Sequence, residues 1–216
     1  MIKILFGVFL QTLFLFNSAF AVEKRPQDFA EYEALVLSPL YLYDTLYPDY
    51  RAIDIARAES LEEFLRRHPD SALVSNAKLR LAEIYSDIEK PEINEFRNEM
   101  YRCIERAASG AKRDLCEAMF DLQTRGKRRD PFYKTKAVEI LKELAERYGH
   151  DKVYLMAEPR VGGFKWVEEE IGGEALFALA GAASSKDRRK IYEMILKEYK
   201  VREFIRKEAE EFLRTH

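Results

Sequence analysis

The clearest pattern of apolar positions in this chain lies between residues 51 and 87. It includes four apolar or aromatic side chains at the helical spacing i, i+3, i+4 and i+7: Leu61, Phe64, Leu65 and His68. This spacing predicts a helix with one buried face. Pro69 cannot continue that helix, and Asp70 or Ser71 can cap a new one. The pattern therefore predicts a helix that ends in a tight corner.

A second helix is predicted directly after this corner. Its apolar face consists of Ala77, Leu81, Ile84 and Tyr85. Small side chains such as Ala77 and Ala82 occupy little space between helices, so they allow two helix backbones to approach closely. Together the two helices form an antiparallel hairpin over residues 51–87.

Three further hairpins are predicted from the same spacing, at residues 91–125, 131–183 and 186–214. One face of the third carries Ala137, Leu141, Leu144 and Tyr148. Residues 149–173, which contain several glycines, interrupt this hairpin and are predicted to form a loop insertion. The whole chain is therefore predicted to be all-α.

The corner pattern itself repeats. A large apolar residue, a second one three positions later and a histidine or tyrosine four positions after that occur at three places, beginning at Leu61, Leu141 and Tyr192. The spacing between the copies is irregular. The repeats therefore predict a divergent stack of antiparallel hairpins, which is an α-solenoid, and not a strictly periodic array.

The first hairpin resembles tetratricopeptide repeats, especially those of bacterial envelope proteins. The residues that carry the resemblance are Leu61, Phe64, Leu65, His68, Pro69, Asp70, Ser71, Ala77, Leu81, Ala82 and Tyr85. His68 stands where the family more often has tyrosine, and Arg57 where it usually has a small residue. Proteins of this kind include the outer-membrane assembly lipoprotein and the periplasmic cell-division coordinator. The resemblance implies a scaffold that binds other proteins.

The first 21 residues are predicted to be a signal peptide and not part of the fold. Lys3 precedes an apolar run from residue 4 to residue 16, and Ala19-Phe20-Ala21 forms an A-x-A cleavage site. Cleavage after Ala21 would leave one domain over residues 22–216 and place it in the periplasm. An uncleaved N-terminal membrane anchor is the alternative. No cysteine lies near the cleavage site, so lipidation of the kind found in lipoproteins is not expected.

Charge and composition argue against a nucleic-acid-binding protein. The chain has 216 residues, a third of them charged, and a formal net charge of −2. Nucleic-acid-binding domains are usually basic. The expected partner is therefore an envelope protein or peptide, and a peripheral association with a membrane is compatible with this surface.

The two cysteines, Cys103 and Cys116, are placed almost symmetrically about the turn of the second hairpin. Residues equally distant from the corner of an antiparallel hairpin face each other. An exported chain with an even number of cysteines makes a disulfide the default interpretation. Two buried thiols are the alternative.

Aromatic residues are the candidates for partner binding: Tyr41, Tyr43, Tyr47, Tyr50 and Trp166. Tyrosine and tryptophan bury a large area at little entropic cost, which makes them effective at interfaces. The tyrosines could equally cap the core of the first hairpin, and Trp166 could pack over a neighbouring hairpin.

No arrangement of residues typical of a catalytic or metal site is recognised in the sequence. His68, His150 and His216 have no metal-binding spacing, and Glu168–Glu170 are interpreted as a solvated helix face. Glu59-Ser60 is similar to the pair that opens the catalytic motif of lytic transglycosylases, but the glycine- and glutamine-containing stretch that follows in that family is missing. We therefore expect neither enzymatic activity nor a cofactor or metal.

The sequence supports two functional hypotheses. The first is a non-enzymatic periplasmic scaffold that binds a protein or peptide on a helical-repeat surface. The second is an accessory protein of cell-wall metabolism that binds or cleaves glycan, using the loop around Trp166 and nearby carboxylates. An adaptor that retains its N-terminal anchor is a third and weaker hypothesis.

Overall fold

The structure is a computed structural model that describes residues 28–37, 48–156 and 164–216. Within these residues the chain is mainly helical, which confirms the all-α class, and it contains one small sheet. The signal-peptide prediction and the residues Tyr41, Tyr43 and Tyr47 lie outside the described part.

Helices begin and end close to the positions that the sequence indicates. They are α2 (Phe29–Leu37), α3 (Tyr50–Arg67), α4 (Val74–Asp87), α5 (Pro91–Glu105), α6 (Gly110–Thr124), α7 (Pro131–Arg147), α8 (Ile171–Ala182), α9 (Ser185–Glu198) and α10 (Glu203–Thr215). Pro91 and Pro131 each occupy the first turn of their helix, where a missing N–H costs no hydrogen bond.

The corner between α3 and α4 differs from its prediction in one respect. His68 ends α3, and its N–H donates to the carbonyl of Phe64 at 2.9 Å. Neither Asp70 nor Ser71 is the N-cap of α4, because that position is Leu73. The Ser71 hydroxyl instead accepts a hydrogen bond at 2.9 Å from the N–H of Leu73, the N-cap residue itself, so it stabilises the turn that leads into the helix.

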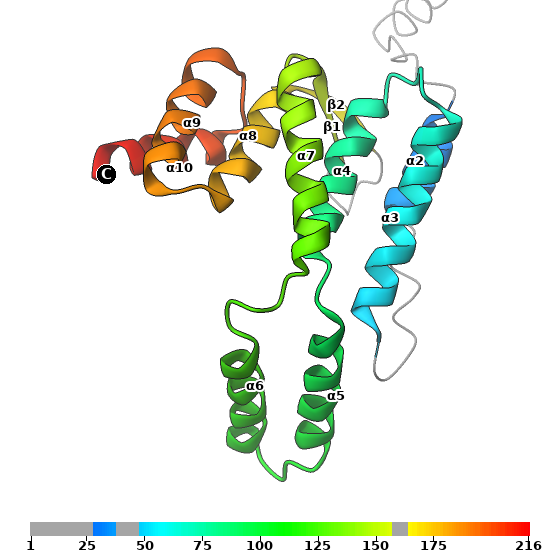
Figure 1. The fold of residues 1–216 in the computed structure, drawn as a ribbon, viewed down its shortest axis with the longest axis vertical. Helices are drawn as coiled ribbons and strands as arrows, with labels where there is room; N and C mark the ends of the chain where they lie inside the picture. The colour runs from blue at the N-terminus through cyan, green and yellow to red at the C-terminus, as the bar shows by residue number, and fades with distance from the viewer. Residues whose placement is uncertain (1–27, 38–47, 157–163) are drawn as a thin grey trace, which may run out of the picture.

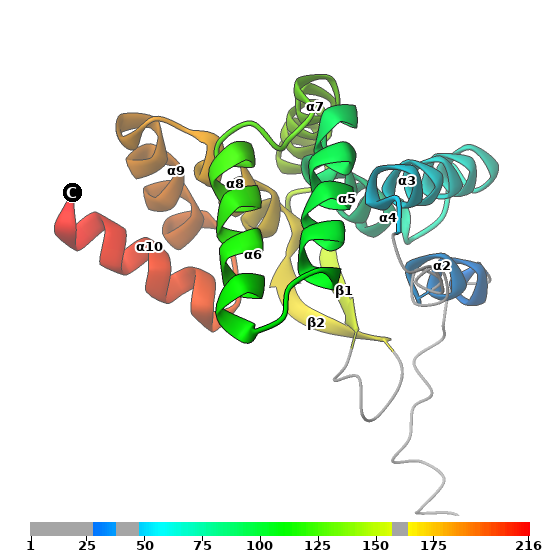
Figure 2. The same cartoon turned by 90° about the horizontal axis from the view of Figure 1, so that it is seen from below.

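Most helices follow one another through the body of the molecule, but one hairpin stands apart (Figure 1). α4 packs against α3 on one side and against α7 on the other, and α7, α8, α9 and α10 continue the series. The hairpin α5–α6 lies between α4 and α7 in sequence, yet it projects away from them. We call this projecting hairpin, residues 91–124, the arm. Seen from below, α5 and α6 lie in front of the body (Figure 2).

This arrangement corrects the prediction that each hairpin stacks on the one before it. Residues 91–125 form a hairpin, but that hairpin is not a layer between its neighbours. α4 and α7 are instead each other's partners, although the whole arm separates them in sequence. Both helices have an apolar face to bury, and in the folded chain these two faces pack against each other in the main core.

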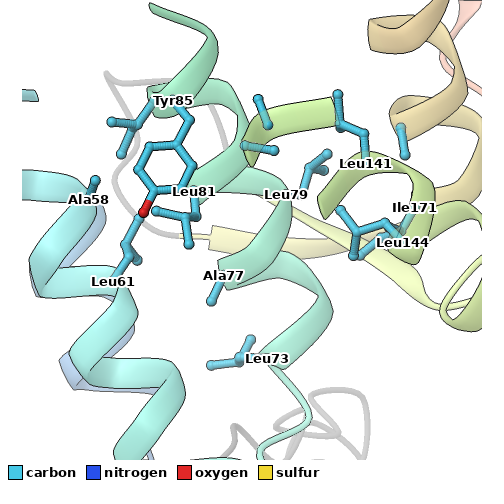
Figure 3. Close-up of a cluster of buried hydrophobic side chains, with 14 of the residues drawn as sticks. Ala58, Leu61, Leu73, Ala77, Leu79, Leu81, Tyr85, Leu141, Leu144 and Ile171 are labelled. Carbon is cyan, nitrogen blue, oxygen red and sulfur yellow. The ribbon is translucent and has the colours of Figure 1, made fainter. Parts of the chain in front are cut away.

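The main core lies where α3, α4 and α7 meet, with α8 beside α7 (Figure 3). It contains the apolar residues of the repeated pattern: Leu61, Phe64, Ala77, Leu81, Ala82, Tyr85, Ala137, Leu141 and Leu144. Tyr148 is half-buried beside them, and Pro69 is exposed at the corner. A second cluster, around Tyr192 and Ile195, joins α8, α9 and α10.

Residues 149–173 contain two strands and not only a loop. β1 (Lys152–Met156) pairs antiparallel with β2 (Phe164–Glu170), and Tyr154 lies opposite Trp166. Glu168–Glu170 therefore lie in a strand, which corrects their interpretation as a helix face. The signal for a strand was the run of apolar residues in Val153–Met156, but a strand needs a distant partner, which local spacing does not reveal.

Candidate functional site

The arm is the part of the described structure that is least covered by the rest of the molecule. Cys103 of α5 and Cys116 of α6 form a disulfide with a Cα–Cα distance of 5.9 Å, as the sequence predicts. The bond ties the two helices together near the tip of the arm. A disulfide is compatible with an oxidising compartment.

An apolar stripe runs along an exposed side of α6. It consists of three side chains at positions i, i+4 and i+7 whose exposed fractions are large: Leu115 (60%), Met119 (51%) and Leu122 (72%). A second side of α6 carries Cys116, Phe120 and Thr124, which are buried, and Cys116 is joined to α5 by the disulfide. α6 is thus apolar on two sides, and only one of them packs against another element among the residues that the structure describes.

A hollow of about 590 Å³ lies between α5 and α6 beside this stripe. Its floor contains both cysteines, and Leu115 and Met119 form one wall. A smaller hollow of about 80 Å³ shares Cys103, Cys116 and Met119 and extends toward Phe96 and Met100. The two hollows form one apolar groove along a face of the arm, and we call it the arm groove.

The rim of the arm groove is positively charged near the tip. Arg102, Arg106 and Lys112 line it, and Glu99 is the carboxylate among the lining residues. In the part of the chain that the structure describes, none of these three cations has an ion-pair partner. The arrangement suits a ligand with apolar side chains and carboxylates.

The arm joins the body through a two-stranded neck. The N–H of Lys90 donates to the carbonyl of Arg128 at 2.8 Å, and the N–H of Asp130 donates to the carbonyl of Ile88 at 2.9 Å. Arg51 of α3 binds the Asp130 carboxylate at 2.8 Å. These contacts fix where the arm starts and where it ends.

Arg97 holds the base of the arm against the body. It is buried, it binds the carboxylate of Glu89 at 2.5 Å, and it lies over the rings of Tyr50 and Phe120. Beside it, burial and a hydrogen bond with Tyr50 raise the pKa of Tyr101 to about 12. Tyr50, a predicted partner-binding residue, thus lies in the contact between α3 and α5.

Trp166 contributes its backbone to β2, opposite Tyr154. Its side chain lies outside the described part of the structure, so its predicted role in binding is not tested. Tyr50 and Trp166 belong to different elements, and the exposed stripe on α6 contains neither of them.

Two of the carboxylates named for the glycan hypothesis, Glu170 and Glu59, lie in different surroundings. Glu170 is the residue before α8; it accepts a hydrogen bond from the N–H of Lys200 at 2.8 Å and lies 3.0 Å from Nδ1 of His150. Burial raises the pKa of Glu170, but these two donors outweigh burial and hold it below its usual value. Glu59 is an exposed residue of α3, and the hydroxyl of its neighbour Ser60 donates to the carbonyl of Ala56.

The described residues contain no group of three or more histidine, cysteine, aspartate or glutamate side chains that could hold a metal ion. None of their helices is both long enough and apolar enough to cross a bilayer.

Comparison of the chain with protein-family models, with curated proteins and with solved structures gives no match. The functional argument therefore rests on the chain's own residues.

The exposed stripe was missed by sequence reasoning, although a signal for it exists. α6 carries Leu115, Met119 and Leu122 in addition to the pair Cys116 and Phe120 that faces α5. A helix in a two-helix hairpin can bury only one face. The surplus apolar face therefore indicates a surface available to a partner.

Proposed function

We propose that this protein is an exported, non-enzymatic scaffold of the cell envelope that holds a protein or peptide on its arm. The exposed stripe of Leu115, Met119 and Leu122 carries the proposal. Three large apolar side chains in a row on a monomer surface are unfavourable in water unless a partner covers them at least part of the time.

The chemistry of the arm groove indicates what kind of segment would fit. An amphipathic helix could place its apolar side chains along the stripe, in the way that helices bind to hydrophobic grooves. Met100 and Met119 contribute flexible side chains that adapt to different partners. The cations Arg102, Arg106 and Lys112 would pair with carboxylates on the same segment.

The disulfide and the signal-peptide-like start of the chain support placing this activity in the periplasm. The body, built from packed antiparallel helices, would serve as the repeat-like support from which the arm projects. The resemblance of residues 61–85 to tetratricopeptide repeats belongs to the same proposal. The glycan alternative gains no support from Glu170, whose carboxylate is engaged by the N–H of Lys200 and by His150, or from Glu59, which lies exposed on α3.

Site-specific cross-linking in envelope extract would test the proposal. A photo-reactive amino acid at Met119 should form a discrete cross-linked product, and the same amino acid at Met194, an exposed residue of α9, is the matched control. Leu122→Lys should weaken the interaction at least about tenfold, because a charge would have to be buried in an apolar contact. Met194→Lys should leave it unchanged.

Equal labelling from Met119 and Met194, or labelling that survives Leu122→Lys, would contradict the proposal. Retention of peptidoglycan by the wild-type chain, with no protein product, would favour the glycan alternative instead.

A further inference from the structure

A separate hollow, lined by polar and charged residues, lies at the neck and away from the tip of the arm. It has a volume of about 660 Å³ and lies where α6 ends and α7 begins. Six cationic side chains line it: Lys90, Arg125, Lys127, Arg128, Arg129 and Lys134. The carboxylate among the lining residues is that of Asp121. We call these six residues the basic collar.

Two members of the collar already have acidic partners. Arg128 binds Asp121 and also donates from Nε to the hydroxyl of Thr124 at 2.8 Å. Arg129 binds the carboxylate of Asp87 at 2.7 Å. These contacts hold both guanidinium groups in place at the wall of the hollow.

The other four cations have no acidic partner among the residues that the structure describes: Lys90, Arg125, Lys127 and Lys134. The whole chain has a net charge of −2, so this local excess of positive charge is not a general property of the protein. Four like charges around one hollow repel each other, and a bound anion would relieve that repulsion.

The backbone presents these side chains in a defined arrangement. Gly126 adopts a positive φ of 69°, which allows the chain to turn sharply after α6. The N–H of Lys127 donates to the carbonyl of Thr124 at 3.0 Å, and Arg128 is paired with Lys90 across the neck. The collar is thus built on a turn that backbone hydrogen bonds hold at both ends.

We propose that the basic collar binds a ligand that carries clustered phosphate groups, either a soluble phosphate ester or the headgroup of an anionic phospholipid. A phosphate monoester carries about −1.5 to −2 charges at pH 7 and three acceptor oxygens, whereas a carboxylate carries one charge. The headgroup of an anionic phospholipid such as phosphatidylglycerol is a phosphodiester with one charge, so at a membrane the cluster would consist of several neighbouring headgroups. Clustered phosphates therefore match four unpaired cations around one hollow better than an extended acidic peptide does. Arginine and lysine are the side chains that bind phosphate most readily.

This site is independent of the arm groove, because the stripe residues do not line it. Its position has a consequence for the arm, however. A headgroup bound at the collar would hold the neck at the surface of a membrane and keep the projecting arm close to that surface.

The test uses the full exported chain and two triple variants with the same change in charge. The collar variant combines Arg125→Gln, Lys127→Gln and Lys134→Gln, all at exposed positions. The matched control combines Lys142→Gln, Lys186→Gln and Arg206→Gln, also at exposed positions but outside the collar. Lys127→Glu alone provides a second collar variant with a smaller change in sequence.

Two probes distinguish the source of the phosphate. Pyrophosphate, measured by calorimetry, represents a soluble ligand. Vesicles of phosphatidylglycerol and phosphatidylcholine, measured by co-sedimentation, represent a headgroup, and vesicles of phosphatidylcholine alone correct for any attachment through residues 1–21. The collar variant should bind about a hundredfold more weakly, since each cation near an anionic surface contributes about fivefold.

Binding of pyrophosphate alone that the collar variant loses supports the site with a soluble ester as its ligand. Collar-dependent binding to phosphatidylglycerol vesicles supports a headgroup, whether or not pyrophosphate also binds. The proposal is overturned if neither probe binds, if the control variant loses binding equally, or if the collar binds a polyglutamate peptide but neither phosphate probe.

Discussion

Asn76 of α4 accepts a hydrogen bond from the backbone N–H of Tyr154 in β1, with 2.6 Å between Oδ1 and the nitrogen. The same side chain donates from Nδ2 to the carbonyl of Lys152 at 3.1 Å. One buried amide thereby satisfies a donor and an acceptor of β1 and attaches the two-stranded sheet to the helical body. A ring contact between Phe29 of α2 and Tyr154, at 5.1 Å, completes this junction.

Removing this amide should destabilise the protein substantially. Asn76→Ala would remove both of these hydrogen bonds to β1 from a buried site, and each such loss costs about 1–3 kcal/mol. We expect the free energy of unfolding, measured by urea denaturation, to fall by about 2–4 kcal/mol. Asn98→Ala is the matched control, because the Oδ1 atom of Asn98 has no hydrogen-bond partner among the described residues. A similar loss in both variants would contradict this role of Asn76.

The base of the arm should depend on Arg97. Arg97→Leu would leave the buried carboxylate of Glu89 without its cation, which costs about 3 kcal/mol in comparable pairs. Hydrogen exchange of the α5 and α6 amides should become faster, while exchange in α7 should change little. Arg66→Leu, which breaks an exposed pair with Glu63, should alter stability by less than about 0.5 kcal/mol. Unchanged exchange in the arm of the Arg97 variant would refute the prediction.

Reduction of the Cys103–Cys116 bond should loosen the arm without unfolding the body. The bond closes a loop between residues 13 apart, which corresponds to about 3 kcal/mol in the loop-entropy model. With a reductant present, exchange of arm amides should accelerate by up to about a hundredfold, and exchange in the main core should stay the same. The double variant Cys103→Ser/Cys116→Ser should exchange rapidly with or without reductant. An arm that is indifferent to reductant would rule out a stabilising disulfide.

Glu170 should make stability dependent on pH in the acid range. Its folded-state pKa is below the usual value of 4.5, because the Lys200 N–H and His150 favour the ionised form more than burial disfavours it. The stabilisation is therefore complete above about pH 5, and it is lost as the pH falls through the lower, folded-state pKa.

Glu170→Gln should consequently be less stable than the wild type near pH 7, and the difference should shrink as the pH is lowered through the acid range. Urea denaturation at several pH values measures it. Glu203→Gln, which removes an exposed carboxylate at the start of α10, is the matched control for the loss of one charge. If the difference in stability between wild type and Glu170→Gln does not vary with pH, the charge of the Glu170 carboxylate does not contribute to stability and the prediction is wrong.

Much of the local structure could be predicted from the sequence, because local chemistry decides it. Pro91 and Pro131 start helices, and the spacing of Leu141, Leu144 and Tyr148 defines one helix face. The pairing of Cys103 with Cys116 also follows from their near-symmetry about a short turn. In each case the interacting residues are close in sequence, so a helical pattern is enough to place them.

Only the tertiary structure decided which of these elements meet. The pairing of α4 with α7 joins helices that are separated by the whole arm, and the pairing of β1 with β2 turns a predicted loop into a sheet. The exposure of Leu115, Met119 and Leu122 is decided in the same way, since an apolar stripe is buried or free according to whether another element packs on it. The sequence determined the apolar faces themselves, whereas long-range packing determined which of them was left for a partner.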